Sequence, residues 1–330
     1  NLFIISNYLA TKLNKVSIIS ASLKYKNKFK KNINFIAPKS KVWDSKSRRT
    51  KYFVCLFLLL EQIIKNNNIL VFAFQANIYC IIICKLLGVK IITRSNSAPS
   101  GWSKNFFKRI IFKFFLNRAD QVIANSNDFI KSLKSEFNVK SMCIYNPLNK
   151  HEIIKKSKIK SKKIFKKSNK LKILNIGRFV DQKDQITFLR ALNLIKDKVE
   201  YEAILVGKGK DKAMLKGYIN KNKLNKKIKL VDFVENPYPF IRETEILILS
   251  SKYEGLPNVL LEAQLLKKFI ISSNCPTGPR EILLNGKAGL LFKVGNFKEL
   301  ANKILYYKKN KKKLSKLVNF GYKKLGRFDY

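Results

Sequence analysis

The feature that most constrains this chain is a regular alternation of short apolar runs and amphipathic segments that begins at Leu171. Apolar runs that end at glycine or serine are typical of buried parallel strands, and the segments between them repeat with a helical period. Strands are expected at 171–176, 201–206, 228–233, 245–249, 269–272 and 290–292. Helices are expected at 185–195, 212–220, 257–266 and from 297 onward. The alternation predicts an α/β fold in which helices cover both faces of a parallel sheet.

The first half of the chain repeats this pattern more faintly, with expected strands at 16–20, 69–74, 90–94, 121–124 and 142–145. We therefore predict two Rossmann-like, doubly wound domains that face each other across a cleft. Residues 1–150 would form the first domain and residues 171–317 the second. Residues 151–170 are rich in Lys and Ser and predict a linker, and residues 318–330 would begin a closing helix.

The charge of the chain is strongly positive, because 68 Lys and Arg face 21 Asp and Glu, for a net charge of +47. Such a charge suggests nucleic acid or an anionic membrane as a partner. Lysine supplies most of it, and lysine lacks the bidentate fork with which arginine recognises bases and phosphates. A compositional bias toward Lys is therefore the preferred explanation, and selected binding to an anionic surface is the alternative. With five cysteines, no Cys-x-x-Cys spacing and one histidine, we expect no metal site, no disulfide and a cytoplasmic location.

Two apolar stretches bear on membranes. Residues 69–89 are interrupted by Gln75, Asn77 and Lys85, so they predict strand, helix and strand rather than a membrane span. Residues 103–116 predict a helix whose apolar face carries Phe107, Ile110, Ile111, Phe114 and Phe115. Beside that face lie Lys104, Lys108, Arg109 and Lys113. This pattern is typical of a helix lying on an anionic membrane, and equally of a helix packed on a Rossmann sheet.

The most specific segment, residues 250–262, follows an expected strand and opens an expected helix. Pro257 suits the first turn of that helix, where a missing N–H costs nothing. The free amides of Asn258 and Val259 would then point toward the cleft. A helix N-terminus of this kind stabilises phosphate by hydrogen bonds and by its dipole.

Two carboxylates, Glu254 and Glu262, lie in the same segment. Eight residues rise about 12 Å along a helix, which is more than the separation of the acid/base pair in glycosidases. Two carboxylates that hold different hydroxyls of one extended ligand fit this spacing better. Two solvated surface glutamates are the alternative.

A second segment, residues 175–184, leaves an expected strand at Gly177, where a glycine lets the backbone approach a ligand closely. Arg178 and Lys183 flank the loop that follows, and two cations at that edge could hold a diphosphate. Solvated charges on a Lys-rich chain are the alternative. Gly207 repeats the exit from strand to glycine, a weak signal by itself.

Together these segments resemble glycosyltransferase family 4, a large retaining group with the GT-B fold. The likeness rests on Gly177-Arg178 with Gln182-Lys183, on residues 206–209 (Val-Gly-Lys-Gly), and on a Glu-x7-Glu pattern formed by Glu254 and Glu262. Residues 275–282, Cys-Pro-Thr-Gly-Pro-Arg-Glu-Ile, look like the segment of members that transfer N-acetylhexosamines or related sugars in surface-polysaccharide assembly. Residues 118–126 and 145–147 resemble the end of that family's N-domain.

The resemblance implies a UDP-sugar donor bound by the second domain, a glycan or lipid-linked acceptor at the first, and neither cofactor nor metal. Arg178 and Lys183 would neutralise the leaving diphosphate, and Glu254 would contact hydroxyls of the donor sugar. Glu262 would hold the ribose hydroxyls. The other implied nucleotide contacts are the amides of Asn258 and Val259 at the phosphates, Phe233 and Val234 at the base, and Gly177, Gly207, Gly255 and Leu256. Peripheral association with the inner face of the cytoplasmic membrane is also implied.

The chain departs from the family at three places. Residues 1–10 look like the helix that follows the family's first strand and glycine-rich loop, so the sequence resembles a fragment. His151 lies in the expected linker and has no assigned role, and Asp184 replaces a small residue after Lys183. A nucleic-acid- or anionic-surface-binding protein without transferase activity is the alternative function. A metal-dependent transferase would need an Asp-x-Asp, which the chain lacks, and the Glu-x7-Glu disfavours an epimerase.

Overall fold

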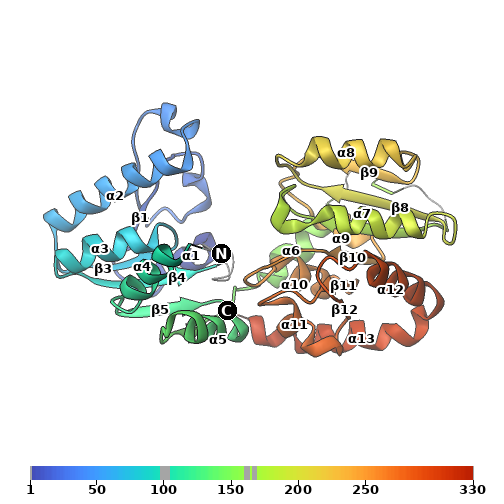
Figure 1. The fold of residues 1–330 in the computed structure, drawn as a ribbon. Coiled ribbons are helices and arrows are strands. Elements are labelled where there is room, and N and C mark those ends of the chain that lie inside the picture. Colours follow the sequence, from blue (N-terminus) through green and yellow to red (C-terminus); the bar gives the residue numbers. More distant parts are fainter. Residues whose placement is uncertain (1, 97–104, 160–163, 166–168, 330) are drawn as a thin grey trace. The chain divides into compact units, whose positions relative to one another are not determined.

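The computed structural model describes residues 2–96, 105–159, 164–165 and 169–329 (Figure 1). Contacts within the chain divide it into two compact units. Unit 1 comprises Asn1–Asn125 and Ile130–Pro147, and unit 2 comprises Ser126–Phe129 and Leu148–Tyr330. Both are α/β units built on parallel strands, so the predicted class of two Rossmann-like domains is confirmed.

Unit 2 is built around a parallel sheet with the strand order β12-β11-β10-β7-β8-β9. Its strands are β7 (Leu171–Ile176), β8 (Tyr201–Val206), β9 (Ile228–Val231), β10 (Ile246–Leu249), β11 (Phe269–Ser273) and β12 (Leu290–Phe292). Strand order reverses between β7 and β10, as in doubly wound nucleotide-binding folds. Ligands of such sheets bind beyond the carboxyl ends of the strands at this reversal. The expected strands of this half match the observed ones to within two residues.

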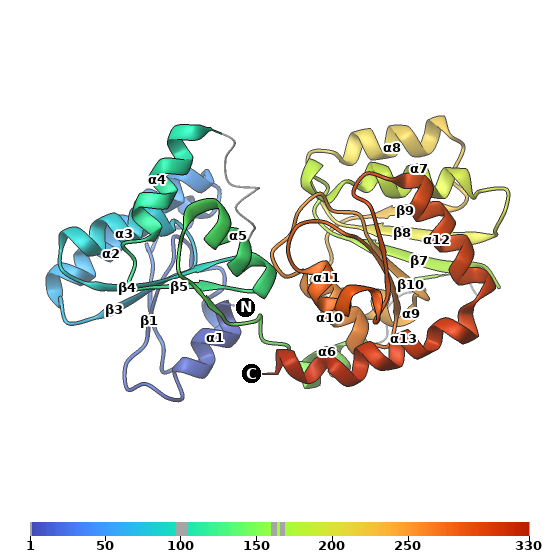
Figure 2. The same ribbon diagram turned by 60° about the horizontal axis from the view of Figure 1, so that its bottom comes forward.

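Helices cover both faces of this sheet (Figure 2). One face packs against α7 (Gln185–Leu194), α8 (Lys212–Lys221) and α12 (Phe297–Lys309). The other carries α9 (Tyr238–Glu243), α10 (Asn258–Leu265) and α13 (Lys311–Lys323), with the short α11 (Pro279–Ile282) beside α10. Strands β8, β10 and β11 are buried along their whole length, which is why they read as continuous apolar runs in the sequence.

Unit 1 contains the parallel sheet β3-β4-β5-β6 and a separate parallel pair, β1 with β2. The strands are β1 (Ser17–Ile19), β2 (Asn34–Ile36), β3 (Leu70–Ala73), β4 (Lys90–Ser95), β5 (Gln121–Ala124) and β6 (Met142–Cys143). The helices are α1 (Leu2–Leu9), α2 (Arg48–Lys65), α3 (Asn77–Leu86), α4 (Phe106–Leu116) and most of α5 (Asn127–Phe137), whose first three residues belong to unit 2. The helix expected over 103–116 begins at Phe106, and residues 103–104 lie outside the described residues.

A buried arginine connects strand β4 of unit 1 to the segment that follows β6. Arg94, at the end of β4, donates from Nη2 to the carbonyl oxygens of Ile144 (2.9 Å) and Tyr145 (3.4 Å) and to Asn146 Oδ1 (3.1 Å). None of the described carboxylates pairs with it, and burial lowers the pKa of its guanidinium. The side chain therefore ties the segment after β6 to the centre of the sheet, using neutral acceptors in place of an ion pair.

The first part of the expected linker at 151–170 is helical, because Lys150–Ser157 forms α6. Two features of this Lys-rich sequence favour a helix, namely a capping residue and a buried apolar residue. The Asn149 side chain caps the helix by accepting a hydrogen bond from the amide of Glu152 (3.1 Å), and Ile153 is buried. This helix packs against α9, where Asn236 donates to the carbonyl of Lys156 (3.0 Å). The segment is part of unit 2.

The closing helix also differs from the expected 318–330. Helix α13 already begins at Lys311 and ends at Lys323, and a short 3₁₀ helix, Lys324–Phe328, follows. The chain then lies beside the start of α6. The amide of Leu148 donates to the carbonyl of Phe328 (3.0 Å), and Lys150 forms an ion pair with Asp329 (2.6 Å).

Candidate functional site

Loops from strands far apart in the sequence meet at the carboxyl edge of the unit 2 sheet. The loop after β7 contains a short 3₁₀ helix, Asp181–Lys183, and the loop after β10 lies against it. The amide of Lys252 donates to the carbonyl of Gln182 (2.8 Å), and Gln182 Nε2 donates to the carbonyl of Tyr253 (2.9 Å). This edge is where strand order reverses, so the loops that carry the predicted residues form one site.

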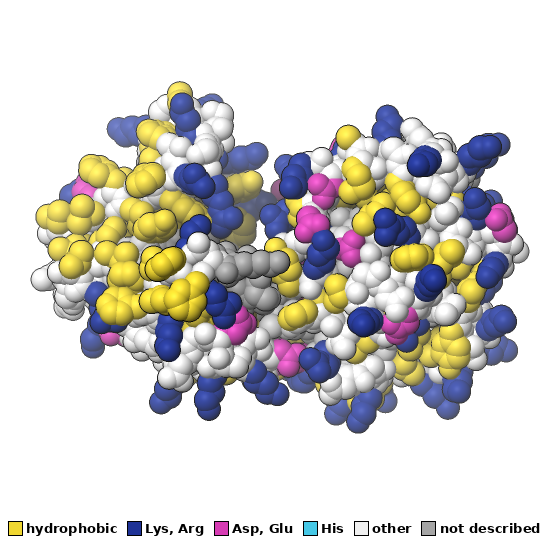
Figure 3. Space-filling model, in the orientation of Figure 1, with side chains coloured by type: hydrophobic (Ala, Val, Ile, Leu, Met, Phe, Trp, Pro, Cys, Tyr) yellow, Lys and Arg dark blue, Asp and Glu magenta, His cyan; other side chains and the backbone are white. Residues whose placement is uncertain are grey.

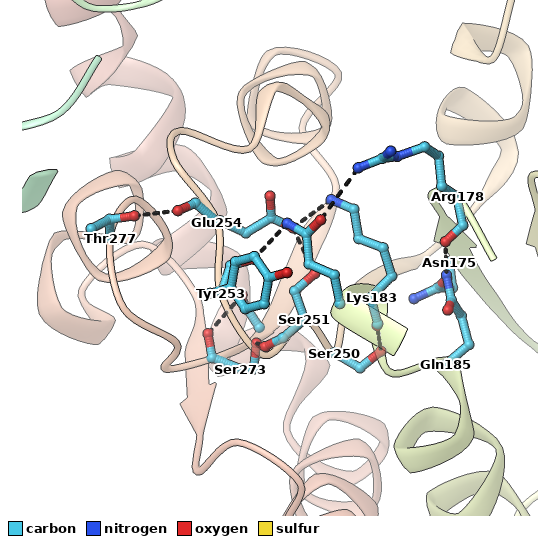
Figure 4. Close-up of polar contacts among 12 residues, drawn as sticks. Asn175, Arg178, Lys183, Gln185, Ser250, Ser251, Tyr253, Glu254, Ser273 and Thr277 are labelled. Atoms are coloured by element: carbon cyan, nitrogen blue, oxygen red, sulfur yellow. Dashed lines mark hydrogen bonds and ion pairs between the residues drawn. The ribbon is translucent and has the colours of Figure 1, made fainter. Parts of the chain in front are cut away.

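Lys183 and Glu254 form an ion pair at the centre of this site (Figure 4). The Lys183 Nζ to Glu254 Oε1 distance is 2.5 Å, and the two side chains are 17% and 8% exposed. Ser251 Oγ donates to the same carboxylate oxygen at 2.6 Å. Because so little water reaches the pair, its electrostatic interaction is stronger than that of a surface ion pair. An ammonium has three N–H donors, so Lys183 can hold Glu254 and still donate to a bound anion.

Arg178 lies on the same loop as Lys183 and is exposed. Its guanidinium donates to Gln182 Oε1 at 3.3 Å, and its carbonyl accepts a hydrogen bond from Gln185 Nε2 at 3.0 Å. Among the described residues it has no carboxylate partner, so its charge is not neutralised by the protein. The site therefore carries an excess of positive charge on one side of the Lys183–Glu254 pair.

The glycines that leave β7 and β8 have different roles in packing. A Cβ on Gly207 would lie 1.9 Å from the carbonyl oxygen of Gly177, so no side chain fits there. A Cβ on Gly177 would meet only the Lys183 and Gln185 side chains, at 3.5 and 3.6 Å, which are ordinary contacts. The fold therefore requires glycine at 207, whereas the packing of the protein leaves room at 177.

The N-terminus of α10 lies at the same edge. The structure places Pro257 as the N-cap residue in extended conformation, one position before the helical turn expected for it. Gly255 and Leu256 are buried in the loop ahead of it, and the amide of Val259 makes no hydrogen bond to the described residues. The dipole of an eight-residue helix and this amide favour an anion at its N-terminus.

The loop ahead of α10 is supported by the segment after β11, a contribution that the sequence indicated only by resemblance. Thr277 Oγ1 donates to the carbonyl of Glu254, and the amide of Glu254 donates to the carbonyl of Pro276 (3.3 Å). Gly278 has a φ of +87°, and a Cβ there would lie 2.3 Å from the carbonyl oxygen of Gly255. Sequence reasoning missed Thr277 and Ser251 as positioning residues. Thr277 lies 23 positions from Glu254, whereas the three-residue spacing of Ser251 and Glu254 was a local signal that could have been used.

Glu262 lies in α10, one helical turn beyond Asn258, and its carboxylate has no hydrogen bond or ion pair with the described residues. Burial raises the pKa of Glu262 to about 7. Burial chiefly, and this carboxylate in addition, raise the pKa of Tyr238, which places the tyrosine nearby. A half-buried carboxyl group without a protein donor is suited to accept hydrogen bonds from a ligand.

Phe233 and Val234 follow β9, next to the loop that leaves β8. Phe233 is exposed, and Lys208 Nζ lies over its ring, 5.0 Å from the centroid. Val234 is half-buried. An exposed aromatic face beside a cation can stack with a planar ligand group. The structure thus places both residues beyond the same sheet edge.

Other chemistries find less support in the described residues. No group of three or more His, Cys, Asp or Glu side chains there is arranged to hold a metal ion. Cys275 is buried beside Glu254, and burial raises the pKa of its thiol to about 12, so it is not a thiolate nucleophile. No helix in the described ranges combines the length and the apolar character needed to cross a bilayer.

Comparison with known proteins agrees with this architecture. The family model for group 1 glycosyl transferases matches residues 156–324. An uncharacterised glycosyltransferase of Methanocaldococcus jannaschii is 32% identical over 200 residues, 57% of this chain. N-acetylgalactosamine-N,N'-diacetylbacillosaminyl-diphospho-undecaprenol 4-alpha-N-acetylgalactosaminyltransferase of Campylobacter jejuni is 26% identical over 230 residues, 66% of this chain. The matched parts span 48% and 60% of those relatives, about half their length.

The fold has solved counterparts. The structure of Anabaena HepE in complex with UDP and glucose superimposes with a TM-score of 0.79, covering 99% of this chain and 91% of that protein at 17% sequence identity. At that identity the likeness establishes the fold alone. The family model, by contrast, covers more than half of the chain, including the loops that carry Arg178, Lys183, Glu254 and Glu262. This chain therefore belongs to the group 1 glycosyl transferases.

Proposed function

We propose that this protein is a retaining hexosyltransferase of the family 4 type, which moves a hexose or N-acetylhexosamine from a UDP-sugar to a glycan or lipid-linked acceptor. The observation that carries the proposal is the gathering of two cations and two carboxylates at the strand reversal of unit 2. Arg178 and Lys183 lie on one loop, and Glu254 and Glu262 flank the start of α10. A nucleoside diphosphate sugar presents matching groups in one extended molecule.

The two cations, Arg178 and Lys183, interact with the leaving group. Transfer breaks the bond between the anomeric carbon and a phosphate oxygen, so negative charge grows on the diphosphate. Arg178 and Lys183 stabilise that charge, and fixed donors aimed at a developing charge lower the barrier. The acceptor hydroxyl attacks from the face that the nucleotide leaves and gives its proton to the departing phosphate oxygen. Configuration is thereby kept, and no metal ion is required.

The two carboxylates and the exposed ring of Phe233 bind the rest of the donor. Glu254 accepts hydrogen bonds from hydroxyls of the transferred sugar while it holds Lys183 in place. Glu262 accepts the two ribose hydroxyls. Phe233 and Val234 contact the base. The remaining nucleotide contacts come from the helix N-terminus and the glycine loops, at Gly177, Gly207, Gly255, Leu256, Asn258 and Val259.

The acceptor is assigned to unit 1, with residues up to about 150 as the acceptor domain. The name of the Campylobacter jejuni relative contains a diphospho-undecaprenol-linked sugar, which supports a lipid-linked acceptor in surface polysaccharide or glycoconjugate synthesis. An acceptor of that kind lies in a membrane, so we place the enzyme at the inner face of the cytoplasmic membrane without a span of its own.

Calorimetric titration with UDP tests the donor site. Wild-type protein is expected to bind UDP, and Glu262→Ala to bind it about 10- to 150-fold more weakly, since a hydrogen bond to a charged group contributes about 1.5–3 kcal/mol. Lys183→Ala and Arg178→Ala are expected to reduce turnover more than acceptor binding, because their partner charge grows in the transition state. Transfer from the UDP-sugar is expected to survive EDTA.

Glu243→Ala is the matched control, because Glu243 is an exposed glutamate at the end of α9, away from this edge. Equal UDP affinity of wild type and Glu262→Ala would overturn the assignment of the ribose site. A strict requirement for Mg²⁺ or Mn²⁺ would overturn the leaving-group mechanism.

A further inference from the structure

The apolar face of α4 does not pack on the sheet. The sequence left two environments open for this helix, a membrane surface and a Rossmann sheet, and the exposure of its apolar side chains argues against the second. Leu116 is buried and Arg109 pairs with Glu136 at 3.0 Å on the side that faces the unit. The opposite side exposes Phe106, Phe107, Ile110, Ile111 and Phe114 to solvent. A helix that only covered a Rossmann sheet would bury this side.

The exposed face continues onto the two neighbouring helices. Helix α3 packs against α4, and α2 packs against α3. Large apolar side chains point outward from both, namely Phe53, Phe57 and Ile64 on α2 and Tyr79 and Leu86 on α3. Together with the five residues of α4 they form the apolar helical surface, whose members are each 46–80% exposed. Hydrophobic side chains gather over α2, α3 and α4 in the space-filling view (Figure 3).

Cations surround this surface. Lys108, Lys113 and Arg118 are exposed on or next to α4, and the Arg118 guanidinium lies 3.3 Å from the ring centroid of Phe114. Arg48 and Arg49 are exposed in the first turn of α2. Residues 1–147 contain 25 Lys and Arg but 5 Asp and Glu. Monomeric soluble proteins rarely expose a contiguous apolar area of this extent, so the surface is suited to a partner.

We propose that the apolar helical surface of unit 1 docks on an anionic lipid bilayer, with its rings in the acyl boundary and its lysines and arginines on the headgroups. The positive charge around this surface favours an anionic bilayer over a second copy of the chain. Anionic headgroups attract the cations around the surface, whereas a second copy of this chain would bring the same positive charge against it. The inference rests on the proposed function in one respect: docking would bring the enzyme to an acceptor that is linked to a lipid in the same bilayer.

Vesicle co-sedimentation of the full chain tests the proposal. The protein is expected to bind phosphatidylcholine vesicles that contain phosphatidylglycerol, and to bind pure phosphatidylcholine vesicles at least tenfold more weakly. The triple variant Phe57→Ser, Phe107→Ser, Ile111→Ser is expected to lose at least tenfold in partitioning. Lys108→Gln and Lys113→Gln are each expected to lose about fivefold at low salt, because a cation near such a surface contributes about that factor.

The matched control carries the same number of exposed apolar side chains changed in unit 2, as Leu194→Ser, Met214→Ser and Tyr306→Ser. Equal losses in the two triple variants would overturn the proposal. The proposal would also be overturned if the unit 1 triple variant bound anionic vesicles as well as wild type does. A dimer in lipid-free solution that this variant dissociates would overturn it too.

Calorimetry with UDP on the same proteins separates the docking proposal from the proposed donor site. A unit 1 triple variant that keeps wild-type UDP affinity but no longer binds vesicles supports docking. Wild-type protein that binds vesicles but does not bind UDP contradicts only the donor site.

Discussion

At the scale of single residues, Glu262 is unusual because burial raises the pKa of its carboxyl group so far that the group is only partly ionised at neutral pH. Its pKa of about 7 lies above the ordinary 4.5. A group whose pKa is higher in the folded than in the unfolded state stabilises the fold below its unfolded pKa. That stabilisation is lost as the pH rises through the folded value. Ionising the buried Glu262 therefore costs the free protein stability, and this cost is complete above about pH 7.

Glu262→Gln is expected to remove this pH dependence, because an amide does not ionise. At pH 8 the variant should melt several degrees above wild type, and at pH 5 the two melting temperatures should nearly coincide, since up to about 3 kcal/mol of ionisation penalty is removed. Thermal melts across this pH range measure the difference. UDP affinity should fall at the same time. A melting difference that is constant from pH 5 to pH 8 would contradict the raised pKa.

The ionic pair at the centre of the site could not be predicted from the sequence. Local patterns indicated Lys183 and Glu254 separately, because each lies in a loop that follows a strand. Their contact joins residues 71 positions apart and depends on β7 lying beside β10 in the sheet. Ser251 reaches the same carboxylate from three residues away on the loop that carries Glu254. The residue types were readable from the sequence, whereas their pairing required the topology.

At the scale of elements, the loops that leave β7 and β8 offer a contrast between two glycines. Gly207→Ala is expected to destabilise the protein by about 3 kcal/mol or more, because its Cβ would overlap the Gly177 carbonyl. Gly177→Ala is expected to melt close to wild type but to bind UDP more weakly, since its methyl group would lie beside Lys183. Melting and UDP calorimetry on both variants test this. Gly207→Ala with wild-type stability would contradict the close packing of these loops.

Elements of unit 2 were predictable because parallel strands buried on both faces appear as continuous apolar runs. Helix α2 was not predicted, although an uninterrupted apolar run, residues 53–60, lies within it. Helix α6 was hidden among lysines, although its Asn149 cap and Ile153 fit a helix. For α4, periodicity identified an apolar face correctly but could not tell whether that face meets the sheet or the solvent. Only the position of the helix beside α3 answers that question.

At the scale of the whole molecule, the division into two units predicts two unfolding transitions. Differential scanning calorimetry is expected to resolve them, and UDP should raise only the one that belongs to unit 2. At a UDP concentration one hundred times Kd the bound unit gains about 2.7 kcal/mol, which shifts its transition by several degrees. Equal shifts of both transitions, or a single transition that shifts as one, would contradict a donor site confined to unit 2.

The close packing of α13 on α10 has a practical consequence for anyone who shortens this chain. Gly321 lies so near α10 that a Cβ there would be 2.8 Å from Gln264 Nε2, and Gln264 in turn donates to the carbonyl of Ile282 at 3.3 Å. Helix α10 carries Glu262 and the amides that we propose to face the phosphates, so α13 supports the proposed donor site from behind. A version trimmed before residue 311 would lose nucleotide affinity with every predicted site residue intact, and its loss could be mistaken for a catalytic defect.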